Sequence, residues 1–143
     1  MFELTYGKSF DEYFETTQRC LRCIEGIEEF YELQKAIYDN DFLSWGDDQI
    51  DELAYNPTKN TLTVRICSSG RDVTYKDRKV SRIFWMIDFY EIELSYFDIA
   101  PEHWIDEVRI EQNKDGKYSC SFGTGELDFR YAYAKVKRSW VEY

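Results

Sequence analysis

Apolar residues in the first forty positions recur at the three- and four-residue steps of a helix. Upstream of them, "SFDE" at residues 9–12 has the Ser-x-x-Glu form of a capping box, which marks a helix start. The pattern predicts an amphipathic helix over about residues 9–38. Gly26 lies inside it and costs about 1 kcal/mol relative to alanine, so two shorter helices are the alternative. The apolar face consists of Phe10, Phe14, Thr17, Leu21, Ile24, Phe30, Tyr31, Leu33 and Ile37.

From residue 49 the pattern changes to the two-residue alternation of strands. The segments "QIDELAY" and "TLTVRIC" flank the turn-forming "NPTKN", which predicts a hairpin. "VSRIFWMIDF" is apolar at consecutive positions, as a central strand would be. "YEIELSYF" and "WIDEVRIEQ" also predict strands.

The C-terminal third predicts a second hairpin and a long last strand. "NKDGK" is a strong hairpin turn, because Asp-Gly tolerates a positive φ, and "YSCSF" follows it. "ELDFRYAYAKV" alternates as one strand until its phase slips at Val136, which indicates a bulge. We therefore expect one α+β domain of 143 residues. Its helical segment (about 9–38) packs on an antiparallel sheet of about six strands (about 48–140).

The chain is acidic, with a formal net charge of −10. Because nucleic-acid binding depends on Lys and Arg at phosphates, this charge argues against direct binding to nucleic acid. It also argues against an anionic membrane surface and favours a basic protein partner. The excess lies early: residues 1–60 hold fourteen acids and five bases, whereas residues 61–143 hold fourteen acids and thirteen bases.

The sequence favours a cytoplasmic location with reduced thiols. Its first fifteen residues contain neither the basic nor the apolar region of a secretory signal. No stretch reaches the apolar length of a transmembrane helix.

The four cysteines admit a zinc site, but buried free thiols explain them more simply. Cys20 and Cys23 form a Cys-x-x-Cys, and Cys67 and Cys120 would complete a four-thiolate set. However, zinc pairs usually lie on turns, whereas this pair lies within the predicted helix, and the other two occupy alternating apolar strands. A redox motif would need a preceding strand. We therefore expect no metal and no other cofactor.

His103 is the only histidine, so a Ser-His or Cys-His nucleophile would have to use it. It lies between Glu102 and Trp104, directly after "AP", which is a common setting for a surface residue. A small enzyme that uses His103 with nearby carboxylates remains the third functional hypothesis.

The segment "SWGDDQIDELAYN" (44–56) concentrates acids between two aromatic residues. A solvated surface, a metal or catalytic site and a partner-binding surface are the three interpretations. Tyrosine and tryptophan among charged residues are typical of a protein interface. We expect these acids to be exposed and unpaired, available to a cationic partner. The predicted partner-binding residues here are Trp45, Asp47, Asp48, Asp51, Glu52 and Tyr55; the alternative face on the helix holds Glu25, Glu28, Glu29 and Glu32.

Three stretches together resemble small immunity proteins of bacterial polymorphic toxin systems. They are "SWGDDQIDELAYNPTKNTLTVRI", "IFWMIDFYEIEL" and "GKYSCSFGTGELDFRYAYAKV". The resemblance covers about residues 42–138 and leaves the N-terminal helical segment outside. It implies a cytoplasmic, non-enzymatic inhibitor that binds a toxin domain. The acidic composition leaves one alternative of the same kind, a phage-type nucleic-acid mimic that blocks a host defence nuclease.

Overall fold

The computed structural model describes residues 10–38, 48–69, 73–97, 105, 107–123 and 127–143. The predicted helical segment forms two helices, α1 (Phe10–Arg22) and α2 (Glu28–Tyr38). The chain breaks at Gly26, whose φ is +81°, a left-handed conformation that side chains with a Cβ rarely adopt. The alternative of two shorter helices is therefore confirmed.

The described strands form three antiparallel sheets. Sheet A has the order β1-β2-β5-β10, sheet B is the hairpin β3-β4, and sheet C has the order β6-β9-β8-β7. The α+β class is confirmed, but the single sheet of about six strands is wrong. The strands are β1 (Gln49–Asn56), β2 (Thr61–Ser69), β3 (Thr74–Tyr75), β4 (Arg78–Lys79), β5 (Arg82–Tyr90), β6 (Glu93–Phe97), β7 (Val108–Gln112), β8 (Tyr118–Phe122), β9 (Leu127–Tyr131) and β10 (Tyr133–Glu142).

One bent two-stranded ribbon accounts for the division into sheets A and C. β5 continues into β6, and β9 continues into β10. These two long segments stay hydrogen-bonded to each other on both sides of the bend, as β5–β10 in sheet A and as β6–β9 in sheet C. Glu91 marks the bend in one strand with a φ of +54°, and the Ala132 N–H donates to the Tyr90 carbonyl at 2.9 Å in the other. The predicted last strand is thus two strands in different sheets. The bulge predicted at Val136 is confirmed, since the register shifts between Val136 and Arg138.

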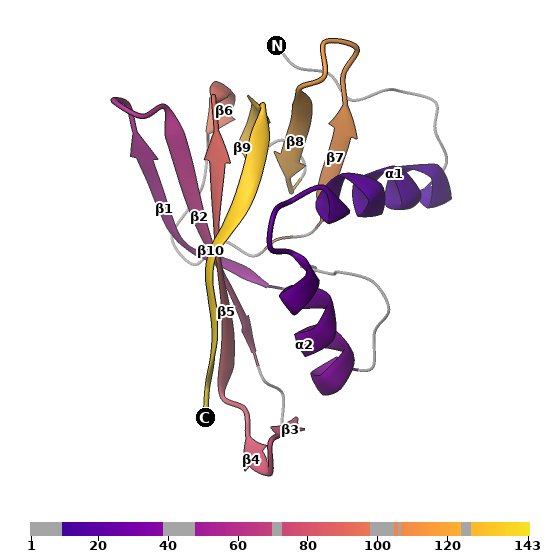
Figure 1. Ribbon diagram of the computed structural model, residues 1–143, viewed down its shortest axis with the longest axis vertical. Coiled ribbons are helices and arrows are strands. Elements are labelled where there is room, and N and C mark those ends of the chain that lie inside the picture. The colour runs from indigo at the N-terminus through magenta and orange to yellow at the C-terminus, as the bar shows by residue number, and fades with distance from the viewer. Residues whose placement is uncertain (1–9, 39–47, 70–72, 98–104, 106, 124–126) are drawn as a thin grey trace.

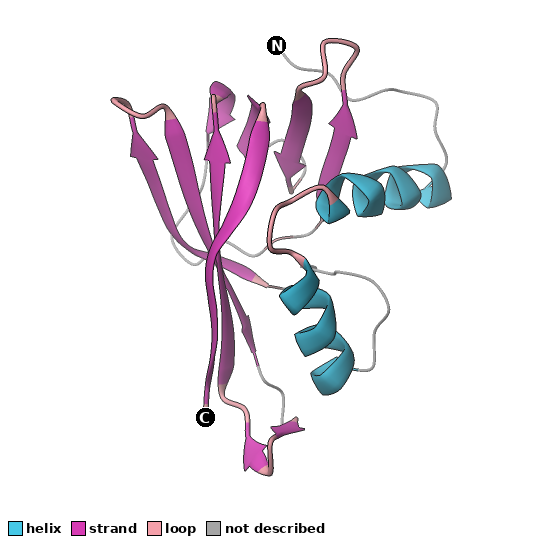
Figure 2. Cartoon of the chain, in the orientation of Figure 1, coloured by secondary structure: helices cyan, strands magenta, loops and turns pink. Residues whose placement is uncertain are grey.

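Both helices lie on the same side of sheet A (Figures 1 and 2). The buried side of α2 packs on sheet A through Phe30. The Phe30 ring centroid lies 3.6 Å from that of Trp85 on β5, and both side chains are fully buried. α1 packs on β7, where the Ile110 N–H donates to Thr17 Oγ1 at 3.2 Å. The edge-on contact of Phe89 with Phe129, at 5.0 Å, joins the cores of sheets A and C.

The linker between the helices covers part of the edge of sheet A. The Glu25 N–H donates to the Ala134 carbonyl at 3.0 Å, and the Val136 N–H donates to the Glu25 carbonyl at 2.8 Å. These bonds occupy backbone groups on the outer side of β10, which protects the edge from pairing with another strand. They also fix where α2 begins relative to the sheet.

The Tyr131 hydroxyl provides a test of the core. It is buried and has no hydrogen-bond partner among the described residues. A buried hydroxyl without a partner costs about 1–3 kcal/mol. We therefore expect Tyr131→Phe to leave the free energy of unfolding unchanged or to raise it by about 1–2 kcal/mol, as measured by chemical denaturation. Tyr133→Phe is the control, because Tyr133 is 54% exposed, and it should change stability by less than about 0.5 kcal/mol. A clear loss of stability in Tyr131→Phe alone would show that the hydroxyl has a partner.

Candidate functional site

The structure separates the acids that the sequence groups together at 44–56. Trp45 and Asp47 lie outside the described residues. Asp48 is buried, with 8% of its surface exposed, and its backbone carbonyl accepts a hydrogen bond from the Ile105 N–H at 2.7 Å. The expectation of an exposed carboxylate is therefore wrong for Asp48. Tyr55 is 52% exposed, and its hydroxyl donates to Asn60 Oδ1 at 2.8 Å across the hairpin.

Asp51 and Glu52 form ion pairs with Arg65 on the neighbouring strand. The distances from the guanidinium nitrogens are 2.5 Å to Asp51 Oδ2 and 3.1 Å to Glu52 Oε2. The cause is local, because a register shift between Ile50 and Glu52 places two β1 residues against one β2 residue. The expectation of unpaired acids is therefore wrong for this pair. Arg65, which sequence analysis missed, supplies the missing base.

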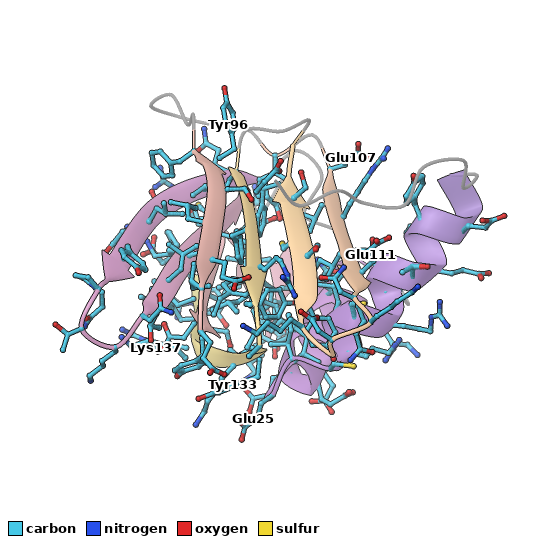
Figure 3. The ribbon with its side chains drawn as sticks, turned by 90° about the horizontal axis from the view of Figure 1, so that it is seen from above. Glu25, Tyr96, Glu107, Glu111, Tyr133 and Lys137 are labelled. Carbon is cyan, nitrogen blue, oxygen red and sulfur yellow. The ribbon has the colours of Figure 1, made fainter. Side chains whose placement is uncertain are left out.

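The four helix acids have a different environment. Glu25 precedes α2, and Glu28, Glu29 and Glu32 lie on it at three- and four-residue steps. All four are exposed, and none forms an ion pair with a described residue. In Figure 3 the Glu25 side chain points away from the ribbon. We call these four residues the acidic α2 face.

The buried side of α2 determines where this face points. Ile27, Phe30 and Ile37 pack into the core and leave the carboxylates on the solvent side. Glu28 and Glu29 also lie in the first turn, where the positive end of the helix dipole favours negative charge. The Arg22 guanidinium lies over the Tyr31 ring, 4.1 Å from its centroid.

Asp51 and Glu52 lie on the side of sheet A opposite α2 and its acids Glu28, Glu29 and Glu32. Arg65, which holds Asp51 and Glu52, lies over the ring of Phe84 at 5.8 Å. α2 packs instead on Trp85, the next residue along β5. Because successive strand residues point to opposite faces, Asp51 and Glu52 cannot form one binding surface with Glu28, Glu29 and Glu32.

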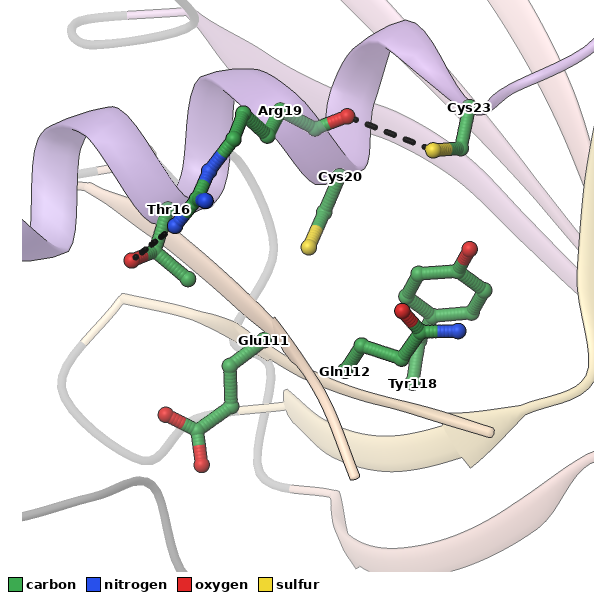
Figure 4. Close-up of a pocket in the computed structure, with 7 residues that line it drawn as sticks. All are labelled: Thr16, Arg19, Cys20, Cys23, Glu111, Gln112 and Tyr118. Atoms are coloured by element: carbon green, nitrogen blue, oxygen red, sulfur yellow. Dashed lines mark hydrogen bonds between the residues drawn. The ribbon is translucent and has the colours of Figure 1, made fainter. Parts of the chain in front are cut away.

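A pocket of about 310 Å³ lies between α1 and the β7–β8 hairpin (Figure 4). Burial raises the pKa of the Cys20 thiol to about 11, and burial together with a hydrogen bond involving Cys23 raises the pKa of Tyr118 to about 12. At neutral pH the Cys20 thiol is therefore protonated, which is not the form that attacks an electrophile or binds a metal. The lining residues are Thr16, Arg19, Cys20, Cys23, Glu111, Gln112 and Tyr118.

The remaining thiols and the histidine complete the comparison with the sequence. Cys20 and Cys120 are buried as expected, but Cys67 is half-buried and Cys23 is exposed, its Sγ donating to the Arg19 carbonyl at 3.4 Å. Within the described residues no group of three or more His, Cys, Asp or Glu side chains is placed to hold a metal ion. His103 lies outside the described residues.

Comparisons with protein-family models, curated proteins and solved structures find no match to this chain. Among the helices that the structure describes, none has the length and apolar character needed to cross a membrane.

Charge reversal at Asp48 and at Asp51, which lie near the start of β1, compares a buried with an exposed carboxylate. Asp48→Lys should lower the free energy of unfolding by about 2–4 kcal/mol, because it places an ammonium group in a buried position. Asp51→Lys should cost less than about 1 kcal/mol, because exposed ion pairs contribute little and Glu52 still faces Arg65. Urea denaturation of both variants measures the difference. Equal losses would contradict the burial of Asp48.

The raised pKa of Cys20 predicts how stability depends on pH. The folded state holds the thiol proton up to a pKa of about 11, against an ordinary value of 9.0. This contribution is fully present below about pH 9 and is lost as the pH rises toward 11, because the unfolded chain ionises first. We expect the free energy of unfolding to fall more steeply between these limits in the wild type than in Cys20→Ala. Parallel curves, measured by denaturant titration at each pH, would contradict the assignment to Cys20.

Proposed function

We propose that this protein is a non-enzymatic, acidic protein-binding inhibitor whose acidic α2 face receives a basic surface of its partner. The observation that carries the proposal is the contrast between the two predicted clusters. Arg65 pairs with Asp51 and Glu52, whereas Glu25, Glu28, Glu29 and Glu32 are exposed without an ion pair among the described residues.

Unpaired carboxylates on a rigid support are suited to electrostatic recognition. Complementary charges raise the rate of encounter, and they add specificity because a like-charged surface is repelled. The burial of Phe30 against Trp85 holds α2 in place, so little conformational entropy is lost when a partner binds. The α1–α2 segment as a whole, residues 10–38, contains seven acids and three bases.

The partner class follows from this chemistry and from the resemblance to immunity proteins. A cationic cleft that binds nucleic acid, such as the active site of a nuclease toxin, is the natural counterpart of a row of carboxylates. The inhibitor would act by covering this cleft. A host defence nuclease would present the same chemistry, so the identity of the partner distinguishes an immunity protein from a phage-type mimic.

Two groups of the pocket beside α1 are not activated for catalysis. Its Cys20 thiol and Tyr118 hydroxyl both have raised pKa values, and so neither is activated as a nucleophile at neutral pH.

The proposal predicts that charge reversal of the acidic α2 face slows binding. The partner is first captured from lysate of the native host, identified by mass spectrometry and purified. Glu28→Lys, Glu29→Lys and Glu32→Lys combined should then lower its association rate at least tenfold at low salt, with folding retained. The wild-type rate should fall as salt rises, because salt screens exposed charges.

The matched control combines Asp77→Lys, Glu91→Lys and Glu142→Lys, which changes the net charge equally at exposed positions outside the helices. It should slow association much less. If both triple variants bind as fast as the wild type, the acidic α2 face is only a solvated surface. If both are slowed equally, the net charge of the protein matters and this face does not.

A further inference from the structure

The face of sheet A opposite the helices is open among the described residues (Figure 1). The register shows which side chains share it. One row across the sheet runs through Gln49, Cys67, Phe84 and Trp140, and the next runs through Glu52, Arg65, Met86 and Arg138. Two further rows are Ala54, Thr63, Asp88 and Lys135, and Asn56, Thr61, Tyr90 and Tyr133. We call these four rows the open face.

The open face has the composition of a protein interface. Phe84 stacks on Trp140 at 4.8 Å, and Tyr90 stacks on Tyr133 at 4.5 Å. Aromatic residues, Met and Arg are the types enriched in protein interfaces. Phe84 is buried by its neighbours on this face but does not belong to the hydrophobic core cluster, which lies on the helix side. Tyr133 remains 54% exposed.

Opposite charges lie at the two edges of the open face. The β1 edge carries Asp51 and Glu52, which share the single cation of Arg65 and so leave one negative charge in excess. The β10 edge carries Lys135, Lys137 and Arg138, which are exposed. The bridge between Glu25 and Lys135 places one acid beside them, so this edge keeps an excess of positive charge. Lys137 is the additional residue of the bulge. The charge therefore changes sign across the four strands.

We propose that the open face binds the open face of a second copy of this chain, with a two-fold axis parallel to the strands. Rotation about this axis places the β1 edge of each copy against the β10 edge of the other. Glu52 and Arg138 belong to the same row, so Glu52 of each copy would face Arg138 of the other copy. An axis perpendicular to the strands would instead place β1 against β1 and β10 against β10, where like charges repel.

Symmetry doubles each of these contacts, because an isologous interface uses the same patch on both copies. The two sheets would pack with their strands within about 30° of parallel, as in other face-to-face sheet pairs. Four strands about 4.8 Å apart and about eight residues long present on the order of 500 Å². Standard interfaces bury about 800 Å² per partner, so we expect a weak dimer that forms at high micromolar concentration.

The dimer goes beyond the proposed inhibitor function and does not depend on it. The helices lie on the far side of each sheet, so Glu28, Glu29 and Glu32 of both copies remain accessible in the dimer. Each copy carries a net charge of −10, and the measurement is made at about 0.15 M salt, where repulsion is screened beyond about 8 Å.

Complementation between two charge-reversed variants tests the proposal. Sedimentation equilibrium of the wild type should show a monomer–dimer equilibrium. Glu52→Arg alone and Arg138→Glu alone should each weaken the dimer at least tenfold, because each creates two like-charge contacts. An equimolar mixture of the two variants should recover the wild-type affinity as a heterodimer, since both contacts then join opposite charges. Circular dichroism confirms that each variant is folded.

The matched controls are Glu29→Arg and Lys114→Glu, which make the same charge changes outside the open face and should leave the dimer unchanged. A second measurement needs no variant. Carbodiimide cross-linking of a mixture of isotopically light and heavy protein should join carboxylates of β1 to Lys135 or Lys137 between copies. A wild type that stays monomeric at 500 µM in about 0.15 M salt would overturn the proposal. So would single variants that dimerise like the wild type, or a mixture that fails to recover the dimer.

Discussion

The ring of Phe30 lies against the indole of Trp85, and the positions of both candidate surfaces depend on this contact. It is the point where α2 meets the central strand pair of sheet A, and both side chains are fully buried. Two buried aromatic side chains contribute several kilocalories per mole of hydrophobic stabilisation. The contact points the carboxylates of α2 outward, and it commits one face of sheet A to the core. The other face of the same strands stays open as a consequence.

Local patterns predicted the helices and strands, because the helical period and the strand alternation of apolar residues can each be recognised within a few residues. The bulge at Val136 was predicted for this reason, from a slip in an alternation, and the glycine at position 26 gave two helices as an alternative to one. The bend at Ala132 left no such signal, since Phe129, Tyr131 and Tyr133 continue the two-residue period through it. What bends the strand is its pairing with β5 and β6, which is a long-range property. The division of one predicted sheet into sheets A and C could not be read from the period.

The ion pairs and the burial of the acids in the candidate site also depend on residues far away in the sequence. The excess of acid before residue 61 is real in the sequence, but the fold brings Arg65 from the balanced half beside Asp51 and Glu52. Burial of Asp48 was hidden for a similar reason, because an acid beside other acids gives no indication of a buried position. By contrast, Glu28, Glu29 and Glu32 were correctly placed on an exposed face, since helical periodicity alone separates them from Phe30 and Ile37. The helices and the two hairpins, which depend on local sequence, were predicted correctly. The expectations for Asp48, Asp51 and Glu52, which depend on contacts between distant segments, were wrong.

The alternation along β5 connects the two proposals. Trp85 faces α2 and packs in the core, whereas its neighbours Phe84 and Met86 lie on the open face. The apolar run "VSRIFWMIDF" predicted a central strand, and β5 does lie between β2 and β10 in sheet A. The described residues leave the open face of β5 uncovered, and a contiguous apolar patch of this kind is typical of an interaction site. A second copy would cover it and would leave two acidic α2 faces on opposite sides of the assembly. Two such faces on one dimer would allow a partner with two basic surfaces to bind with avidity, which neither face alone supplies.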